Sequence, residues 1–385
     1  MDEQEERMAS GRIARFRFYL RQRPVLLVAF SVLGVMSFLA VTGLSRAYHA
    51  QRETLGSRWF ARGVSDLDAK NYHAAVTDFR AALLYSRDSF SYQQNLAEAL
   101  IGMKRTGEAS AYLLNLWERE PENGVVNLEL ARIASQQPGQ TEQALRYYHD
   151  AIYAAWPAGE EAKRRDARLE LIEILLRDGR RAEAQAELIA LSENEGNNPA
   201  EQDELGDLFL RAGDYEHALA AFRMSLRAAR NNLSAAAGAG QAAFELGQYP
   251  LALRYLQIAV TGDPNDAQSA DRLKMAQTVL RFDPFRRNIS ATERNRAVMA
   301  AFTVAGERLK ACPVPKAPGS GPSMNDEWTD LQPRITNAGL RANANLAESA
   351  MDVVFRVERE TSVACGAPNG PDFALLLISR LHEGN

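Results

Sequence analysis

Six alanines recur at a nearly constant interval, and this period limits the folds that the chain can adopt. Successive members lie 34, 35, 40, 34 and 34 residues apart, at Ala75, Ala109, Ala144, Ala184, Ala218 and Ala252. Four residues after each comes a large side chain: Phe79, Leu113, Tyr148, Leu188, Phe222 and Leu256. Twelve residues before four of them comes another small one: Gly63, Ala97, Gly206 and Gly240. Such a period predicts stacked helical units rather than one globular core.

The stretch LGDLFLRAGDYEHALAAF, residues 205–222, indicates why the small residues recur. Gly206 and Ala218 occupy places in a helix-like sequence where a bulky core residue could lie. We expect them to let the two helices of one unit approach closely, while Phe222 packs across onto the next pair. A helical glycine costs about 1 kcal/mol relative to alanine, and packing must offset that cost. These residues are therefore expected to be structural.

The pattern resembles the tetratricopeptide repeat (TPR) family, whose unit is a helix–turn–helix of about 34 residues. In the first unit the resemblance is carried by Trp59, Gly63, Tyr72, Ala75, Phe79 and Ala82. The fifth unit matches through Leu205, Gly206, Phe209, Tyr215, Ala218 and Phe222. The sixth matches through Gly240, Tyr249, Ala252, Leu256, Ala259 and Pro264, and Pro121 closes the second. The resemblance covers residues 56–266 and implies an all-α, right-handed superhelical solenoid of about six repeats.

The third and fourth units depart from the family pattern. The turn QQPGQTEQ is one residue longer than usual, which lengthens a surface loop. The segment WPAGEEAKRRD holds further residues and is expected to extend the first helix of the fourth unit. Ile172 stands where a small residue is expected, so this helix pair should sit further apart.

Residues 24–44, PVLLVAFSVLGVMSFLAVTGL, carry no charge. A helix of these 21 residues, rising about 1.5 Å per residue, spans the roughly 30 Å hydrocarbon layer. A buried core helix and a cleavable signal peptide are the alternatives. The run is long for a signal peptide, and VTGLSRAYHA offers no convincing cleavage site. We therefore expect an uncleaved transmembrane anchor in contact with the lipid bilayer.

Arginines on the two sides of this segment bear on its orientation. Six precede it, at Arg7, Arg12, Arg15, Arg17, Arg21 and Arg23, and four follow within a similar distance, at Arg46, Arg52, Arg58 and Arg62. Positive charge favours the cytoplasmic side. The bias predicts a single-pass inner-membrane protein with a cytoplasmic tail at 1–23 and residues 45–385 in the periplasm. A cytosol-facing array is the alternative.

The concave face of TPR arrays commonly binds an extended or helical peptide, mainly through the first helix of each unit, and the resemblance implies the same here. The candidate contacts are Phe60, Val64, Glu98, Arg132, Glu173, Asp207, Arg211, Gln241 and Phe244. They combine apolar anchors with charges of both signs. One TPR sub-family holds an acidic chaperone tail with a Lys/Asn/Arg clamp, but no asparagine follows the small residues here. A solvated groove without a dedicated ligand is the alternative.

The chain has two cysteines, Cys312 and Cys365, and neither belongs to a CxxC motif or a Cys/His cluster. Zinc is therefore not expected. Each lies at the end of an expected helix, just before a Pro/Gly-rich turn. In an oxidising compartment we expect them to form a disulfide, whereas two buried thiols would be expected in the cytosol.

Residues 267–385 are expected to be helical but not repetitive. AQSADRLKMAQTVLRFDP is expected to cap the solenoid, which would otherwise expose an apolar side. A loose turn at 313–325 and two further helices should follow, and the run Leu375 to Ile378 should be buried in the last. The region is either an elaborate cap or a small binding module.

Sequence motifs for chemistry are absent. HExxH, GxSxG and phosphate-binding glycine loops do not occur, and the formal net charge of −4 does not favour nucleic acid. We expect no catalysis, no cofactor, no metal and no small-molecule substrate.

These features predict a non-catalytic scaffold or assembly factor that binds proteins or peptides at the membrane. A cytosol-facing regulator that binds a peptide signal is the alternative. A polysaccharide- or lipid-handling accessory protein would need more aromatic stacking positions than Phe60 and Phe244 supply.

Overall fold

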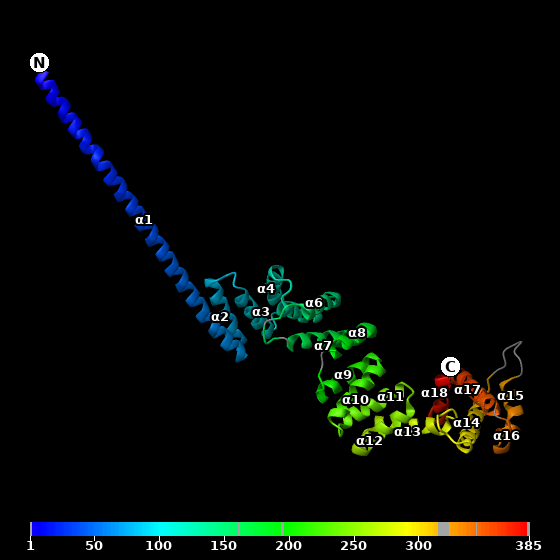
Figure 1. The fold of residues 1–385 in the computed structure, drawn as a ribbon. Coiled ribbons are helices and arrows are strands. Elements are labelled where there is room, and N and C mark those ends of the chain that lie inside the picture. Colours follow the sequence, from blue (N-terminus) through cyan, green and yellow to red (C-terminus); the bar gives the residue numbers. More distant parts are fainter. Residues whose placement is uncertain are drawn as a thin grey trace. The chain divides into compact units, whose positions relative to one another are not determined.

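The computed structural model describes residues 2–156, 158–160, 162–193, 196–314, 323–343 and 345–382, and Figure 1 shows their helices. Across these ranges every regular element is a helix, apart from one isolated bridge between Asn123 and Ala155. The contacts divide the chain into two units, residues 1–168 and 169–385. Each unit is described by itself below.

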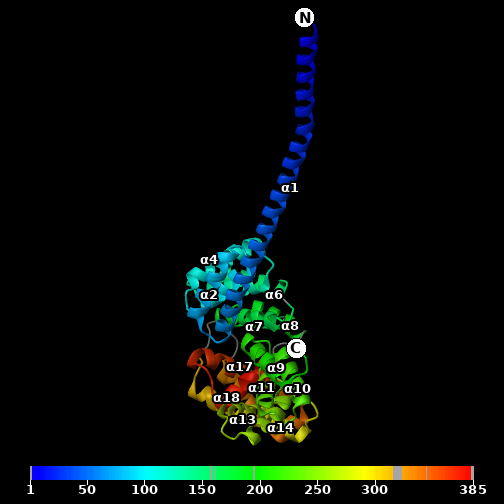
Figure 2. The same cartoon turned by 90° about the vertical axis from the view of Figure 1, so that its left-hand side faces the viewer.

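The first unit contains three antiparallel helix pairs. Its helices are α1 (Asp2–Asp68), α2 (Tyr72–Tyr85), α3 (Phe90–Gly102), α4 (Thr106–Arg119), α5 (Gly124–Ser135) and α6 (Thr141–Tyr153). The end of α1 pairs with α2, α3 with α4, and α5 with α6. In Figure 2, α1 continues far beyond the pair that it forms with α2.

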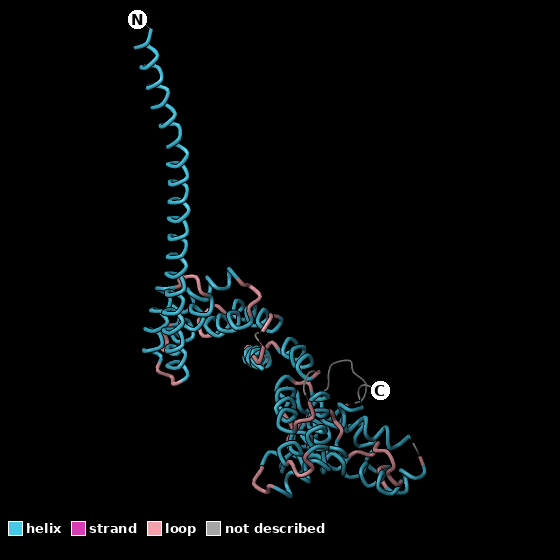
Figure 3. Tube along the Cα trace, turned by 60° about the vertical axis from the view of Figure 1, so that its left-hand side comes forward, coloured by secondary structure: helices cyan, strands magenta, loops and turns pink. Residues whose placement is uncertain are grey.

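The second unit holds three further pairs and a group of C-terminal helices. The pairs are α7 (Ala162–Arg177, which begins in the first unit) with α8 (Arg181–Ser192), α9 (Pro199–Ala212) with α10 (Tyr215–Ala228), and α11 (Leu233–Glu245) with α12 (Tyr249–Gly262). The C-terminal helices are α13 (Ala267–Phe282), α14 (Ala291–Ala311), α15 (Met324–Leu331), a 3-10 turn (Gln332–Arg334), α16 (Asn337–Ala342), α17 (Asn345–Cys365) and α18 (Gly370–His382). Short loops join the helices of each pair (Figure 3).

The periodic residues of the sequence form the contacts between the paired helices. All six marker alanines have no exposed surface, and the large residue four positions later is at most 2% exposed in every unit. A Cβ built on Gly206 would lie 2.6 Å from the Phe222 ring, and one built on Gly238 would lie 2.3 Å from it. Phe222 therefore packs between its own pair and the next one, which confirms the expected role of Gly206.

One turn position has a left-handed backbone in every pair. The residues are Lys70, Lys104, Gly139, Gly179, Gly213 and Gly247, with φ between 60° and 80°. Each lies five residues before a marker alanine. Glycine adopts this conformation without the steric cost that a Cβ brings. The turn therefore repeats with the same period as the helix contacts.

The departures in the middle of the array have clear structural counterparts. Helix α7 has 16 residues, against 14 in α9, so the predicted extension of the fourth unit's first helix is confirmed. Ile172 is fully buried in one core with Leu188 and Leu205. The wider spacing of this pair stays a prediction.

The C-terminal helices share one hydrophobic core with α12 and α13. Val298, Phe302, Met351, Val354 and Leu375 belong to this core. Within the expected run in α18, Leu375, Leu376 and Ile378 are buried and Leu377 is half-buried. Helix α13 lies where a cap was expected, against α12 and α11.

The prediction of two helices after the turn at 313–325 was wrong. In the described part of the chain beyond Cys312 there are four α-helices, because α15 and α16 precede α17 and α18. Helix α15 begins inside the expected turn, at a capping box formed by Ser323 and Asp326. With 8 and 6 residues, α15 and α16 are too short to show a helical period in the sequence. Residues 315–322 of the expected turn lie outside the described part.

Among the described residues, α1 is the one helix long and apolar enough to cross a membrane. None of the residues in its apolar window is buried. The same helix continues without a break to Asp68 and supplies the first helix of the first pair.

Candidate functional site

The expected binding surface lies on the first helices of the pairs, and we call it the first-helix face. It consists of the nine candidate residues, which the structure places on α1 (Phe60, Val64), α3 (Glu98), α5 (Arg132), α7 (Glu173), α9 (Asp207, Arg211) and α11 (Gln241, Phe244). Six of the candidates come directly after the contact position of their helix, so the repeat brings them into equivalent positions: Val64, Glu98, Arg132, Glu173, Asp207 and Gln241.

Glu173 and Arg211 form an ion pair between neighbouring helix pairs. The Arg211 guanidinium donates to both carboxylate oxygens of Glu173, at 2.6 and 2.7 Å. The hydrogen bond from Arg211 lowers the pKa of Glu173. Both side chains are about half exposed, at 50% and 52%, so each retains surface for a partner. A two-pronged guanidinium–carboxylate contact fixes the orientation of both groups.

Glu98 is an exposed residue of α3, but neighbouring protein groups displace part of the water around its carboxylate. Burial raises its pKa, and the like charge of Glu129 on α5 adds to the effect, while Lys163 opposes it. Arg132 donates to Glu129 at 2.7 Å. Glu98 and Arg132 are thus both close to Glu129, in a group of charges on α3, α5 and the start of α7.

Asp207 on α9 is likewise an exposed residue whose carboxylate is partly shielded from water by neighbouring groups. Partial burial raises its pKa, the neighbouring Asp203 raises it further, and Arg211 opposes the shift. The Asn232 amide donates to Asp203 at 2.5 Å, which joins α9 to the cap of α11. Gln241, the equivalent residue on α11, is half-buried. Among the polar candidates of the second unit, Glu173 and Arg211 are therefore the two that a direct ion pair holds in place.

The apolar candidates pack between helices. Phe60 stacks on Tyr92 of α3 with ring centroids 4.7 Å apart, and Val64 packs against the core of the first unit. Phe244 packs against both cores of the second unit and lies edge-on to Tyr249, with centroids 5.3 Å apart. These three residues stabilise the stack of helices. The first-helix face therefore presents mainly charged and polar groups.

No group of three His, Cys, Asp or Glu residues suited to a metal ion occurs within the described ranges. The chemistry available to the first-helix face is recognition by ion pairs and hydrogen bonds.

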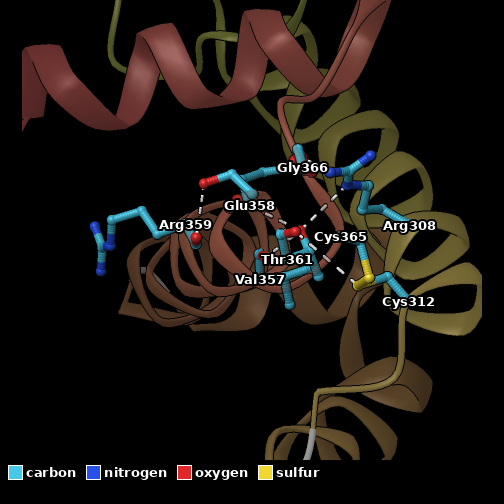
Figure 4. The surroundings of a disulfide bond; sticks show 9 residues. Arg308, Cys312, Val357, Glu358, Arg359, Thr361, Cys365 and Gly366 are labelled. Carbon is cyan, nitrogen blue, oxygen red and sulfur yellow. Dashed lines mark hydrogen bonds between the residues drawn. A yellow bond between two sulfur atoms is a disulfide. The ribbon is translucent and has the colours of Figure 1, made fainter.

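Cys312 and Cys365 form the expected disulfide, which joins the end of α14 to the end of α17 (Figure 4). Their Cα atoms lie 6.3 Å apart, within the usual range for a disulfide. Next to the bond, Arg308 donates to the Thr361 hydroxyl at 3.2 Å and to the Gly366 carbonyl at 2.9 Å. The cross-link and these hydrogen bonds hold the same two helices together.

Glu358 is a buried carboxyl group close to this cross-link. It has no exposed surface, and neither oxygen has a hydrogen-bond partner of ordinary geometry. Burial raises the pKa of Glu358 to about 8, and the carboxylate of Asp372 on α18 adds to the shift. Arg308 opposes it. Glu358 therefore holds a proton at neutral pH.

The sequence reasoning missed two hollows beside α17, of about 740 and 630 Å³. They are lined by residues of α15, α17 and α18 together with Phe285. One signal was available in the sequence. Charged and aromatic residues recur every four positions along a helix whose other positions are largely apolar. One row is Glu348, Asp352 and Arg356, and the other is Phe355 and Arg359.

Comparisons with known proteins give likenesses in structure alone. No family model matches the chain, and no curated protein matches it. YrrB, a TPR protein with an unusual peptide-binding site, is 16% identical over 50% of this chain and 96% of its own, with a TM-score of 0.41. The C-terminal part of a TPR repeat-containing protein from Cytophaga hutchinsonii is 15% identical over 62% of this chain and 93% of its own, with a TM-score of 0.44. PilW, a type IV pilus biogenesis factor, is 16% identical over 58% and 98%, with a TM-score of 0.38.

Proposed function

We propose that this chain, whose helix pairs have the TPR fold, is a non-catalytic protein–protein interaction scaffold or assembly factor. The observation that carries the proposal is the first-helix face, where Glu173 and Arg211 orient each other through a two-pronged ion pair and both stay about half exposed. Preorganised charges of this kind recognise a polar or charged segment at low entropic cost. The apolar candidates are already packed, so charge complementarity supplies most of the selectivity.

Site-specific photo-cross-linking in intact cells tests this function. A photoreactive amino acid replaces Asp207 or Gln241 on the first-helix face, and exposed Arg223 or Arg254 on the second helices serves as the control. We expect one partner to be cross-linked from the first-helix face and not from the controls. Arg211→Glu, which breaks the pair with Glu173, should lower the yield at Asp207 several-fold, while Arg223→Glu should not. Equal cross-linking from both faces contradicts the proposal.

The membrane anchor and its topology are part of the proposal. We propose a cytoplasmic tail at 1–23, a transmembrane helix at 24–44, the solenoid at 45–266 and the capping region at 267–385, with everything beyond residue 44 in the periplasm. The uncharged segment, the arginine bias and a cysteine pair suited to an oxidising compartment support this arrangement.

Thiol labelling distinguishes this topology from the cytosol-facing alternative. A membrane-impermeant thiol reagent is applied to intact cells with and without a reductant. If Cys312 and Cys365 react from outside after reduction alone, the region is exported and cross-linked. If they react without reductant once the cells are broken, and not before, the array faces the cytosol and the regulator is the better hypothesis.

A further inference from the structure

The two hollows beside α17 adjoin each other because they share Asp352 and Arg356 in their linings. The larger is bounded by α15 and α17, and the smaller by α17, α18 and Phe285 before α14. We call the two together the α17 groove. It is built from helices outside the six repeated pairs, so it is separate from the first-helix face.

The larger hollow is acidic with an apolar base. Four carboxylates line it, from Asp326, Glu327, Asp330 and Asp352, against the guanidinium of Arg356 in the lining and that of Arg334, which pairs with Asp330 at 3.5 Å. Arg356 is paired with Glu327, and this pair joins α17 to α15. Asp352 is exposed and forms no ion pair with the described residues. The buried residues Leu331 and Val353 supply the apolar surface.

The smaller hollow combines three aromatic rings with charged side chains of both signs: Glu348, Asp352, Arg356 and Arg359. The rings of Phe285 and His382 have centroids 4.6 Å apart, and Phe355 lies 6.5 Å from Phe285. Phe285 is 38% exposed, which leaves part of a ring open to a ligand. An aromatic or large aliphatic side chain would bury its surface against these rings.

We propose that the α17 groove binds a segment of a partner protein in which a lysine or arginine is followed, a short distance along, by an aromatic or large apolar residue. The cation neutralises the carboxylate excess of the larger hollow, and its aliphatic stem lies on Leu331 and Val353. The apolar residue enters the ring-lined hollow. The carboxylate excess of the larger hollow disfavours an acidic segment there.

A defined peptide series tests this with the full chain in lipid nanodiscs. The probe is fluorescently labelled acetyl-Gly-Arg-Gly-Phe-Gly-amide, and three further peptides replace its arginine with citrulline, its arginine with glutamate, or its phenylalanine with alanine. Fluorescence anisotropy gives the Kd of each. We expect the arginine–phenylalanine peptide to bind most tightly, and Asp330→Asn with Asp352→Asn to weaken it by roughly fivefold.

Two controls make the result decisive. Asp271→Asn removes an exposed carboxylate from α13, outside the groove, and should leave the Kd unchanged. Phe285→Ala should abolish the preference for phenylalanine over alanine without changing the preference for arginine over citrulline. The proposal is overturned if no peptide binds, if citrulline or glutamate binds as well as arginine, or if Asp271→Asn weakens binding as much as the groove variants. None of these results affects the cross-linking test of the first-helix face.

Discussion

At the scale of single residues, six equivalent turn positions have a left-handed backbone, and two of them are not glycine. Lys70 and Lys104 have φ of 60° and 61°, where the other four pairs have glycine. A Cβ in this conformation costs roughly 1–2 kcal/mol. The first two turns therefore store strain that the later turns avoid.

Lys70→Gly and Lys104→Gly should each stabilise the array against unfolding. Glycine relieves the strain but gains entropy in the unfolded chain, so the expected net gain is about 0.5–1 kcal/mol. Thermal unfolding followed by circular dichroism measures it. Lys70→Ala and Lys104→Ala keep the Cβ and are the matched controls, which should give no gain. An equal gain from alanine would mean that the lysine charge, not the backbone, is the cause.

Gly238 tests the contact between successive pairs. Alanine at this position improves helix propensity by about 1 kcal/mol, yet its Cβ would lie 2.3 Å from the fully buried Phe222 ring. We expect overpacking to win and Gly238→Ala to destabilise the array by about 1–3 kcal/mol. Gly107→Ala is the control, because a Cβ built at Gly107 meets no atom within 4 Å. Denaturant unfolding of both variants decides between propensity and packing.

The buried Glu358 predicts a pH dependence of stability. Its pKa is raised to about 8 in the folded protein, so the folded state binds its proton more tightly than the unfolded state does. This stabilisation is complete below the unfolded pKa of roughly 4.3 and is lost as the pH rises towards 8. The loss is on the order of a few kcal/mol.

Glu358→Gln should flatten this dependence, because an amide has a similar shape and does not titrate. Unfolding of the cross-linked wild type and the variant, followed between pH 5 and pH 9, gives the comparison. If the two slopes agree, Glu358 does not hold a proton in the folded protein.

At the scale of helices, the disulfide connects α14 to α17 across a sequence separation of 53 residues. Closing a loop of this length restricts the unfolded chain by up to about 4 kcal/mol in the chain-entropy model. The double variant Cys312→Ser with Cys365→Ser should lower the free energy of unfolding of the C-terminal helices by that amount or less. Trp328 on α15 is stacked on Phe302 with ring centroids 3.6 Å apart, so it gives a local fluorescence signal once Trp59, Trp117 and Trp156 are replaced by phenylalanine in every protein compared. Reduced wild type should match the double variant, and a difference between them would point to the serines themselves.

The elements that sequence could predict are those with a strong period. The marker alanines and the residues four positions later fixed the six pairs, because burial at every repeat forces the same residue types to recur. Helices α15 and α16 were not predicted from the sequence, because their starts depend on local caps at Ser323 and Thr336 rather than on a period. The left-handed turns at Lys70 and Lys104 were not predicted either, because a lysine in the sequence does not indicate a positive φ.

The helices that carry the candidate residues were predictable from the sequence, whereas the contacts of their side chains were not. Repeat spacing placed Glu173 and Arg211 on adjacent helices, and the structure brings them together. Phe60 and Phe244 were expected to be open to a ligand, but the sequence could not show that Tyr92 and Tyr249 would pack against them. The α17 groove was not foreseen, because it depends on how non-repetitive helices meet.

At the scale of the whole molecule, α1 is one continuous helix from Asp2 to Asp68. Its uninterrupted course means that the segment proposed to lie in the bilayer and the first helix of the array share one axis and one rotational setting. One inserted residue turns the helix pairs of the first unit by about 100° around that axis and moves them by about 1.5 Å, whereas seven residues restore the direction within roughly 20° while adding about 10 Å.

An alanine inserted after the exposed Ala50 should therefore turn the array away from any partner fixed in the membrane, and seven inserted residues should turn it back. Cross-linking yield at Glu98, a candidate of the first unit, would fall with the single insertion and recover with seven, if orientation governs access. A yield that falls steadily with length would show that height matters instead. If the yield recovers, the number of residues between the proposed bilayer segment and the first turn sets the direction in which the first unit faces.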